Sequence, residues 1–203
     1  MTDLTVDDIL DLRAYERVRD DFRARVIERK RDRRVALGPV VTVLFESVDT
    51  VRFQVQEMAR VERISTDEGI AGELEVYNRL LPRPGELSAT LFIELTSEDE
   101  LRHWLPRLVG IERAVAVELE GGDRVRSVPE AAHGAALTRA EVTPAVHYLR
   151  LAFRPDQVTR FAAGPSALVV DHPDYPARGE LTASTRAALL GDLEGRTEPI
   201  GLA

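Results

Sequence analysis

The chain has 203 residues, of which 44% are hydrophobic and 31% are charged, and its formal net charge at pH 7 is -8. This length and composition predict a single domain over residues 1–203 with a core of its own. The acidic balance argues against a general nucleic-acid binder. Because the sequence contains no cysteine, it excludes disulfides, thiolate nucleophiles and cysteine-ligated metal sites.

The hydrophobic runs are short. The run at residues 40–45 is far below the roughly 18–20 apolar residues that cross a bilayer, so we expect no membrane span. The first ten residues, MTDLTVDDIL, are acidic and lack the basic and apolar regions of a secretory signal. These features predict a cytoplasmic protein.

The first predicted element is a long helix. Leu12, Tyr15, Phe22 and Val26 recur at helical spacing, which predicts a helix over residues 12–34. Its second half is rich in arginine, and we expect a solvated face with internal salt bridges there. A surface that binds phosphate or a partner is the alternative interpretation.

Lys30 is the only lysine in the chain and lies within this charged run, at residues 23–34. We expect its amine to be exposed to solvent. An exposed lysine keeps its charge, so its position disfavours an enzyme that forms a Schiff base through lysine.

The next elements are a strand and two helices. Residues 40–45 (VVTVLF) predict a strand buried on both faces. From Val51 the apolar residues alternate as on a strand and then recur as on a helix, so we expect a hairpin partner for this strand that passes into a helix. Thr66 or Asp67 caps a further helix, which Pro82 ends.

The second half of the chain mixes strands and helices. We predict strands over 87–95, 113–120, 125–128, 145–153 and 167–170, and helices over 97–108, 155–163 and 182–193. Residues 129–144 show no period and predict a long mobile loop. Without regular βαβ alternation, the pattern predicts an α+β fold, with a mainly antiparallel sheet flanked by helices and an N-terminal helix.

Polar residues border the apolar stripe between residues 51 and 78. They are Gln54, Gln56, Glu57, Arg60, Glu62, Glu73, Tyr77 and Asn78. A buried polar group without a partner costs roughly 1–3 kcal/mol, so polar residues near a core are candidates for a site. We take Glu57, Arg60 and Tyr77 as candidate catalytic residues. The alternative is that Glu57, Arg60 and Glu73 form buried ion pairs.

Two of the four histidines suggest a metal site. His147 falls on the apolar face of its predicted strand, where desolvation lowers a histidine pKa, and His172 follows a strand. With Glu57 or Glu94, the two imidazoles predict a facial triad of the kind that binds non-haem iron. The alternatives are a histidine bonded within the core and a histidine in a turn.

Six segments of the chain resemble one known family. They are RRVALGP (33–39), VRFQVQEMARVERI (51–64), ELEVYNRLLP (73–82), SATLFIEL (88–95), VHYLRLAF (146–153) and VDHPDY (170–175). They resemble an uncharacterised bacterial family, a domain of unknown function, whose genes often neighbour rubrerythrin and an iron–sulfur oxidoreductase. The resemblance implies a role near oxidative stress and iron chemistry, and assigns no reaction or catalytic residue.

Three functions are compatible with these features. The first is a protein that binds iron or haem in oxidative-stress metabolism, and whether it is an oxidoreductase stays open. The second is a non-enzymatic partner of a rubrerythrin or iron–sulfur oxidoreductase system, which binds through residues 23–34 and 129–144. The third is a small-molecule binder that recognises an anion through Arg52, Arg60 or Arg63. Any of these functions is compatible with a homo-oligomer.

Overall fold

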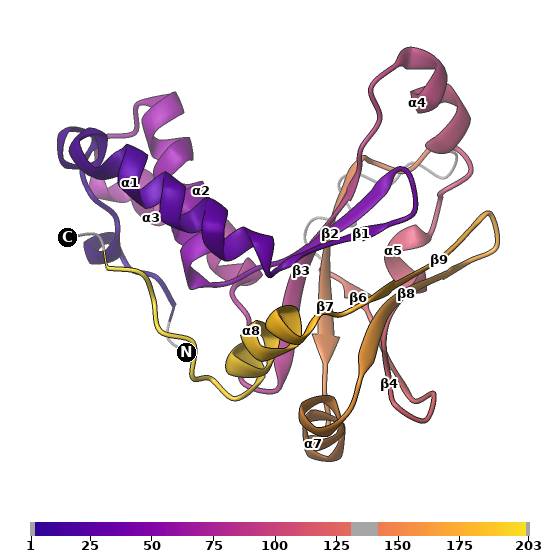
Figure 1. Cartoon of the computed structure of the whole chain (residues 1–203). Coiled ribbons are helices and arrows are strands. Elements are labelled where there is room, and N and C mark those ends of the chain that lie inside the picture. Colours follow the sequence, from indigo (N-terminus) through magenta and orange to yellow (C-terminus); the bar gives the residue numbers. More distant parts are fainter. Residues whose placement is uncertain (1–2, 131–141, 202–203) are drawn as a thin grey trace.

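Two antiparallel sheets and the helices around them form the protein (Figure 1). The structure is a computed structural model and describes residues 3–130 and 142–201. The helical elements are η1 (Val6–Asp8), α1 (Leu12–Arg31), α2 (Val48–Glu62), α3 (Asp67–Tyr77), η2 (Asn78–Leu80), α4 (Glu98–Trp104), α5 (Ile111–Ala114), α7 (Pro155–Ala163) and α8 (Ala183–Leu193). The strands are β1 (Arg34–Leu37), β2 (Val41–Phe45), β3 (Glu86–Ile93), β4 (Val115–Leu119), β5 (Arg124–Arg126), β6 (Val128–Pro129), β7 (Val146–Ala152), β8 (Ser166–His172) and β9 (Tyr175–Glu180).

The α1 helix begins and ends at identifiable signals. The Asp11 carboxylate accepts a hydrogen bond from the Ala14 N–H at 2.9 Å and caps the first turn. The helix ends three residues earlier than the periodicity predicts. The Arg33 carbonyl accepts from the Phe45 N–H, so the chain passes directly into the pairing of β1 with β2. The sequence analysis missed β1.

The segment after residue 47 is helical throughout, so the predicted hairpin partner for residues 40–45 is wrong. Ser47 and Thr50 form a reciprocal capping box that starts α2. Val51 and Val55, four residues apart, are both fully buried against the neighbouring elements. The capping box therefore decides between the two patterns in favour of the helix.

Sheet A has the strand order β1-β2-β3-β7-β6, with every neighbouring pair antiparallel. All five residues of β2 are buried, as the continuous apolar run predicts. Val41, Val43 and Phe45 belong to the main core, whereas the alternate residues point to the opposite face. Helices α1, α2 and α3 lie on that opposite side in Figure 1.

Sheet B has the order β5-β4-β8-β9 and includes β9, a strand that we had not predicted. Tyr175 of β9 connects the two sheets, because its hydroxyl donates to the Leu37 carbonyl at 2.6 Å and accepts from the Val40 N–H at 3.1 Å. Gly38 is needed there: its φ is +69°, and a Cβ would lie 2.7 Å from the Tyr175 hydroxyl.

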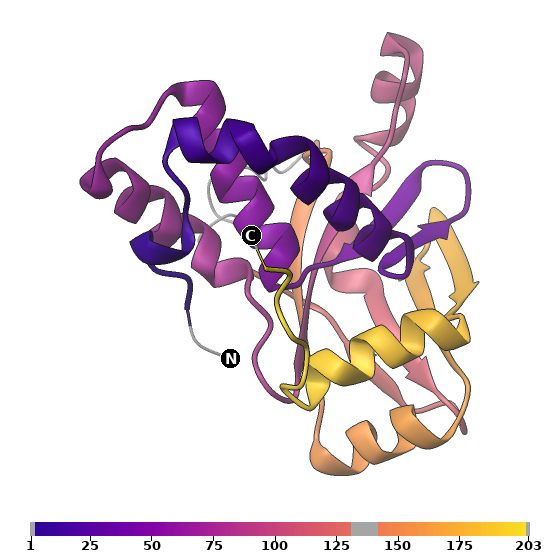
Figure 2. The ribbon, with the colours of Figure 1, turned by 60° about the vertical axis from the view of Figure 1, so that its left-hand side comes forward.

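The main core lies between the two sheets. It contains inward residues of both sheets together with Phe161 of α7 and Leu189 of α8. Helices α7 and α8 run side by side below it in Figure 2. A second cluster, with Val51 and Leu74 at its centre, packs α2 against α3 and the N-terminal segment.

This architecture confirms the predicted α+β class, the antiparallel sheets and the N-terminal helix. The helix expected over 97–108 is shorter than predicted, because α4 ends at Trp104, just before Pro106. Within the expected loop 129–144, residues 131–141 lie outside the described residues. Among the described helices, none combines the length and apolar composition that crossing a bilayer requires.

Candidate functional site

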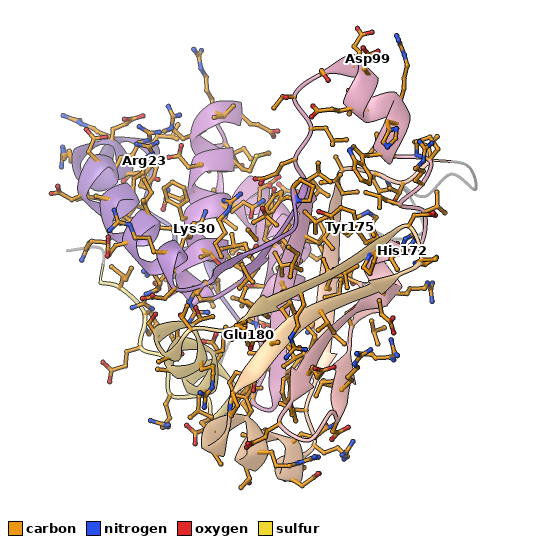
Figure 3. All side chains as sticks on the ribbon, turned by 45° about the vertical axis from the view of Figure 1, so that its right-hand side comes forward. Arg23, Lys30, Asp99, His172, Tyr175 and Glu180 are labelled. Atoms are coloured by element: carbon orange, nitrogen blue, oxygen red, sulfur yellow. The ribbon has the colours of Figure 1, made fainter. Side chains whose placement is uncertain are left out.

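The two predicted histidine ligands are buried at separate places. His147 of β7 faces the core, where its Nε2 lies 3.0 Å from the Thr143 hydroxyl and burial lowers its pKa, as its strand position predicts. His172 lies at the end of β8, beside Tyr175 (Figure 3). Its Nε2 lies 3.1 Å from the Val109 carbonyl. Both imidazoles therefore have partners within the protein.

The two predicted carboxylate ligands also have other partners. Glu57 on α2 accepts two hydrogen bonds from Arg19 of α1, at 2.8 and 2.9 Å, and one from the Tyr15 hydroxyl at 2.7 Å. Glu94, half exposed after β3, accepts from Arg34 at 2.5 Å and from Thr42 at 2.7 Å.

The structure thus does not bring His147, His172, Glu57 and Glu94 together. In the described ranges, no group of three or more His, Asp or Glu side chains has a metal-binding arrangement. The physical reason is direction: His147 points into the core between the sheets, whereas Glu57 points from α2 towards α1. Binding of iron or haem stays a prediction, which metal analysis and an absorption spectrum of the purified protein can test.

The three predicted catalytic residues divide between two places. Hydrogen bonds from Arg19 lower the pKa of Glu57 to about 2, which leaves a weak base. Arg60 lies beside it, 3.4 Å from a Glu57 oxygen. Tyr77 is remote from both; burial raises its pKa, and it has a hydrogen-bonding contact with Gln54. Glu57 and Arg60 therefore form the ion pair that was the alternative interpretation.

Two further residues of the polar block, Gln56 and Asn78, hold the N-terminal segment in place. The Gln56 amide exchanges hydrogen bonds with the backbone of Leu10, at 3.0 and 2.7 Å. Asn78 does the same with Leu4, at 3.0 and 2.9 Å. Arg52, a predicted anion contact, donates to the Ile200 carbonyl near the C-terminal end. These side chains act within the fold.

Gln54 is different, because it lines a cavity between α1, α2 and the helix-facing side of sheet A. The volume is about 320 Å³, and the lining residues are Lys30, Leu44, Glu46, Gln54, Thr90, Phe92, Val146 and Tyr148. Strand register explains this set. Leu44, Thr90 and Tyr148 are direct neighbours across β2, β3 and β7, so they share one face.

Glu46 supplies a buried carboxylate to this cavity. Its side chain is 3% exposed and lies between the end of β2 and the cap of α2. One oxygen accepts from the Thr50 hydroxyl and the other from the Thr90 hydroxyl, each at 2.5 Å. Among the described residues, no cation forms a salt bridge with it. The N-terminus of α2 adds a favourable electrostatic contribution at this position.

Lys30 supplies the cation, and the structure corrects the expectation that it is fully exposed. It lies in the last turn of α1, where the helix approaches sheet A (Figure 3), and is half-buried. Its Nζ is 5.5 Å from the centroid of the Phe53 ring. Burial lowers its pKa most, the nearby Arg34 lowers it further, and Glu46 opposes both. A larger fraction of the amine is therefore neutral than in an exposed lysine.

Tyr148 completes the polar part of the cavity wall. Burial raises the pKa of its phenol, with a further rise from Tyr77 and Glu46 and a lowering contact with Gln54. The phenol therefore stays protonated at neutral pH and can donate a hydrogen bond. An amine, a carboxylate, a phenol and an amide thus face one cavity whose remaining wall is largely apolar.

The sequence analysis missed Lys30, Glu46, Thr90 and Tyr148 as site residues. One signal was present: Lys30 is the single lysine of the chain, and the sequence analysis used it only to argue against a Schiff base. Nothing local marks Glu46 or Thr90, since they meet across 44 residues of sequence.

Comparison with known proteins identifies no function. A family model described as "Protein of unknown function (DUF3501)" matches residues 3–193. The chain is similar to a solved structure from Burkholderia pseudomallei K96243, described as a novel protein of unknown function. The two are 37% identical with a TM-score of 0.87, over 95% of this chain and 100% of that one. Among curated proteins, none matches the sequence.

Proposed function

The chain belongs to the DUF3501 family of proteins of unknown function, and from its own cavity we propose that it binds a small polar organic molecule between Lys30 and Glu46. The site lies between α1, α2 and sheet A. The third function considered from the sequence, a small-molecule binder, is thus the one that the geometry supports best. The residues involved differ from the arginines considered there.

A single observation carries this proposal: Lys30 and Glu46 line the same cavity, have opposite charges and form no salt bridge with each other. Moving charged groups out of water is unfavourable unless they are paired or hydrogen-bonded. Within residues 3–130 and 142–201, the Glu46 carboxylate receives two hydroxyl donors and Lys30 contacts one aromatic ring. A ligand that accepts from the amine and donates to the carboxylate satisfies both groups.

The rest of the wall suits a small organic ligand. Leu44, Phe92 and Val146 supply apolar surface, while Gln54 and Tyr148 supply hydrogen-bonding groups for orientation. Polar groups that converge beside apolar side chains in a hollow of a few hundred Å³ are typical of such sites. A volume of about 320 Å³ restricts the ligand to a small molecule.

The experiment is a thermal-shift screen of the full chain with 2-oxo acids, dicarboxylic acids and amino acids. A compound at about 100 times its Kd stabilises the folded state by about 2.7 kcal/mol. For a chain of this size, we expect Tm to rise by roughly 5–10 °C. Glu46→Gln removes the carboxylate and should abolish the shift, whereas Glu57→Gln, which changes a carboxylate of α2 outside the cavity lining, should keep it. A screen without any shift, or a shift that Glu46→Gln retains, contradicts the proposal.

The other expectations from the sequence remain proposals that need their own tests. They are iron or haem binding, a rubrerythrin or iron–sulfur oxidoreductase partner, a homo-oligomer and a cytoplasmic location. Metal analysis tests the first, and co-purification with the two proteins tests the second. Light scattering and cell fractionation test the other two.

A further inference from the structure

We propose that the Lys30 amine condenses with an aldehyde or ketone that carries an anionic group, and forms an imine in the cavity beside Glu46. This inference rests on the proposed function, because it assigns a ligand class and a covalent step to the same site. The geometry that carries it is the position of Lys30, which lines two hollows of different chemistry.

The first argument is the placement of the amine. Lys30 lines the cavity that contains Glu46 and also lines a second hollow of about 520 Å³. It has no carboxylate partner among the described residues, and the Phe53 ring lies on one side of it. A lysine held in a salt bridge must break that contact before it reacts, but Lys30 has no such contact to break.

The second argument is the protonation state that a nucleophilic amine needs. Only the neutral amine attacks a carbonyl carbon, and a buried lysine beside another cation loses its proton more readily. Burial of Lys30 and the nearby Arg34 both lower its pKa. Glu46 acts in the opposite direction, which keeps this effect partial.

The third argument is that the cavity contains groups that can move protons. The Nζ lone pair adds to the carbonyl carbon, and the carbonyl oxygen takes up a proton. The carbinolamine then loses that oxygen as water, so that amine and carbonyl give imine and water with no change in oxidation state. The Glu46 carboxylate can accept the proton from the attacking nitrogen, and the Tyr148 phenol can donate to the oxygen.

The fourth argument concerns the anionic group. The second hollow is lined by Ile27, Lys30, Arg31, Arg34, Ala36 and Thr42, a set with three cations and no carboxylate. The salt bridges of Arg31 with Glu28 and of Arg34 with Glu94 involve half-exposed or exposed side chains, and such pairs contribute little. A carboxylate or phosphate next to the carbonyl would lie among these cations.

The test uses the full chain, glyoxylate as the probe and cyanoborohydride to trap the imine. Because Lys30 is the only lysine, peptide mapping by mass spectrometry separates its carboxymethyl adduct from that of the chain's α-amine. We expect Lys30 to be labelled faster than N-acetyl-lysine by about tenfold or more, since the cavity holds the carbonyl against the amine. Labelling no faster than N-acetyl-lysine overturns the proposal.

Variants separate the roles of individual side chains. Lys30→Arg keeps the charge but removes the primary amine. We expect its Tm to stay unchanged and its labelling to be lost, which would show that the Lys30 amine is the group that reacts. In Glu46→Gln, we expect a lower maximal labelling rate, and an inflection of the rate at lower pH because the carboxylate no longer favours the protonated amine. An unchanged rate and pH profile in Glu46→Gln contradicts the role of this carboxylate.

The preference for an anion has a matched control. Propionaldehyde offers a carbonyl without a carboxylate, so the ratio of the glyoxylate rate to the propionaldehyde rate reports anion recognition. Arg34→Gln should lower this ratio several-fold. Arg102→Gln, an exposed arginine on α4, should leave it unchanged. An equal ratio in both variants overturns the anionic part of the proposal.

The outcomes also separate this inference from the proposed function. Compounds that raise Tm in a Glu46-dependent way, together with slow labelling of Lys30, would leave the binding site standing and overturn imine formation. Fast, saturable labelling that needs Glu46 would support the inference directly. Fast labelling that is independent of Glu46 and does not saturate with glyoxylate overturns it, since Lys30 is then reactive without a site.

Discussion

Arg19 in the middle of α1 and Lys30 in its last turn each lie near a carboxylate of a neighbouring element, but only Arg19 forms an ion pair with that carboxylate. Arg19 donates to both oxygens of Glu57 at 2.8 and 2.9 Å. Lys30 and Glu46 instead line one cavity without a salt bridge. The paired charges hold α1 against α2, whereas the unpaired charges are the groups that the proposed ligand would contact. Polar residues near a core therefore indicate a site only where their partners are missing.

This difference has an energetic consequence that mutations can measure. Removing one partner from a satisfied pair leaves the other partner without compensation, which lowers the free energy of unfolding. Removing Lys30 or Glu46, which form no salt bridge with each other, relieves the unfavourable free energy of burying an unpaired charge. Such a substitution should therefore reduce ligand binding more than stability. Substitutions in the two regions should thus separate stability from ligand binding.

The largest effect should come from the buried ion pair of Arg33 with Asp192. The two side chains are 2% and 0% exposed, and their atoms approach to 2.5 and 3.1 Å. Asp192→Ala leaves a buried guanidinium uncompensated, so we expect a loss of about 3–5 kcal/mol in the free energy of unfolding. Urea denaturation measures this loss.

The double variant Arg33→Met with Asp192→Leu is the control. It replaces both charges with apolar groups of similar size, so most of the lost stability should return. A loss below about 1 kcal/mol in Asp192→Ala is typical of an exposed ion pair. It would show that the pair of Arg33 with Asp192 contributes little to stability.

An intermediate effect is expected at Glu57, which is partly exposed. Glu57→Gln replaces charged hydrogen bonds with neutral ones and should cost about 1.5–3 kcal/mol at neutral pH. The pKa of Glu57 is lowered from 4.5 to about 2 in the folded protein. Its contribution is therefore complete above pH 4.5 and is lost as the pH falls towards about 2.

Urea denaturation of both proteins across this acidic range checks the expectation. The difference between the wild type and Glu57→Gln should shrink steadily as the pH falls below 4.5. A difference that stays constant with pH would show that the charge of Glu57 contributes nothing to stability. That result would contradict the view that the ion pair of Glu57 with Arg19 stabilises the fold.

The smallest effect on stability should come from Glu46. In Glu46→Gln, the hydroxyls of Thr50 and Thr90 keep an amide partner, and the cost of burying a charge disappears. We expect the free energy of unfolding to change by less than about 1 kcal/mol. The same urea series measures it. A loss as large as that of Glu57→Gln would make Glu46 a structural residue and weaken the proposed site.

The fold was largely predictable where a local pattern reports burial. The continuous run of β2 predicted a strand buried on both faces, and the alternation of β7 placed His147 on the core side with a lowered pKa. Short edge strands were missed, because β1 and β9 expose alternate residues and carry arginine and glutamate. At Val51 a capping box decided between two patterns that periodicity alone left open.

Of the candidate site, the sequence analysis singled out only Gln54, and it placed Lys30 in an exposed run. Glu57 and Arg60 were correctly identified as partly buried, but their partners Tyr15 and Arg19 lie about 40 residues earlier in the chain. No pattern in the sequence reports which buried polar groups are already satisfied. That information requires the distances between side chains.

The sequence by itself determined the class of fold, the N-terminal helix and the faces of the central strands, because the burial of apolar side chains imposes periods of 2 and 3.6 on the chain. Only the tertiary structure decided that Lys30, Glu46, Thr90 and Tyr148 share a cavity. Antiparallel register places Thr90 beside Tyr148, and the packing of α1 brings Lys30 over them. Neither the register nor the packing is a local property, so no local pattern could reveal the site.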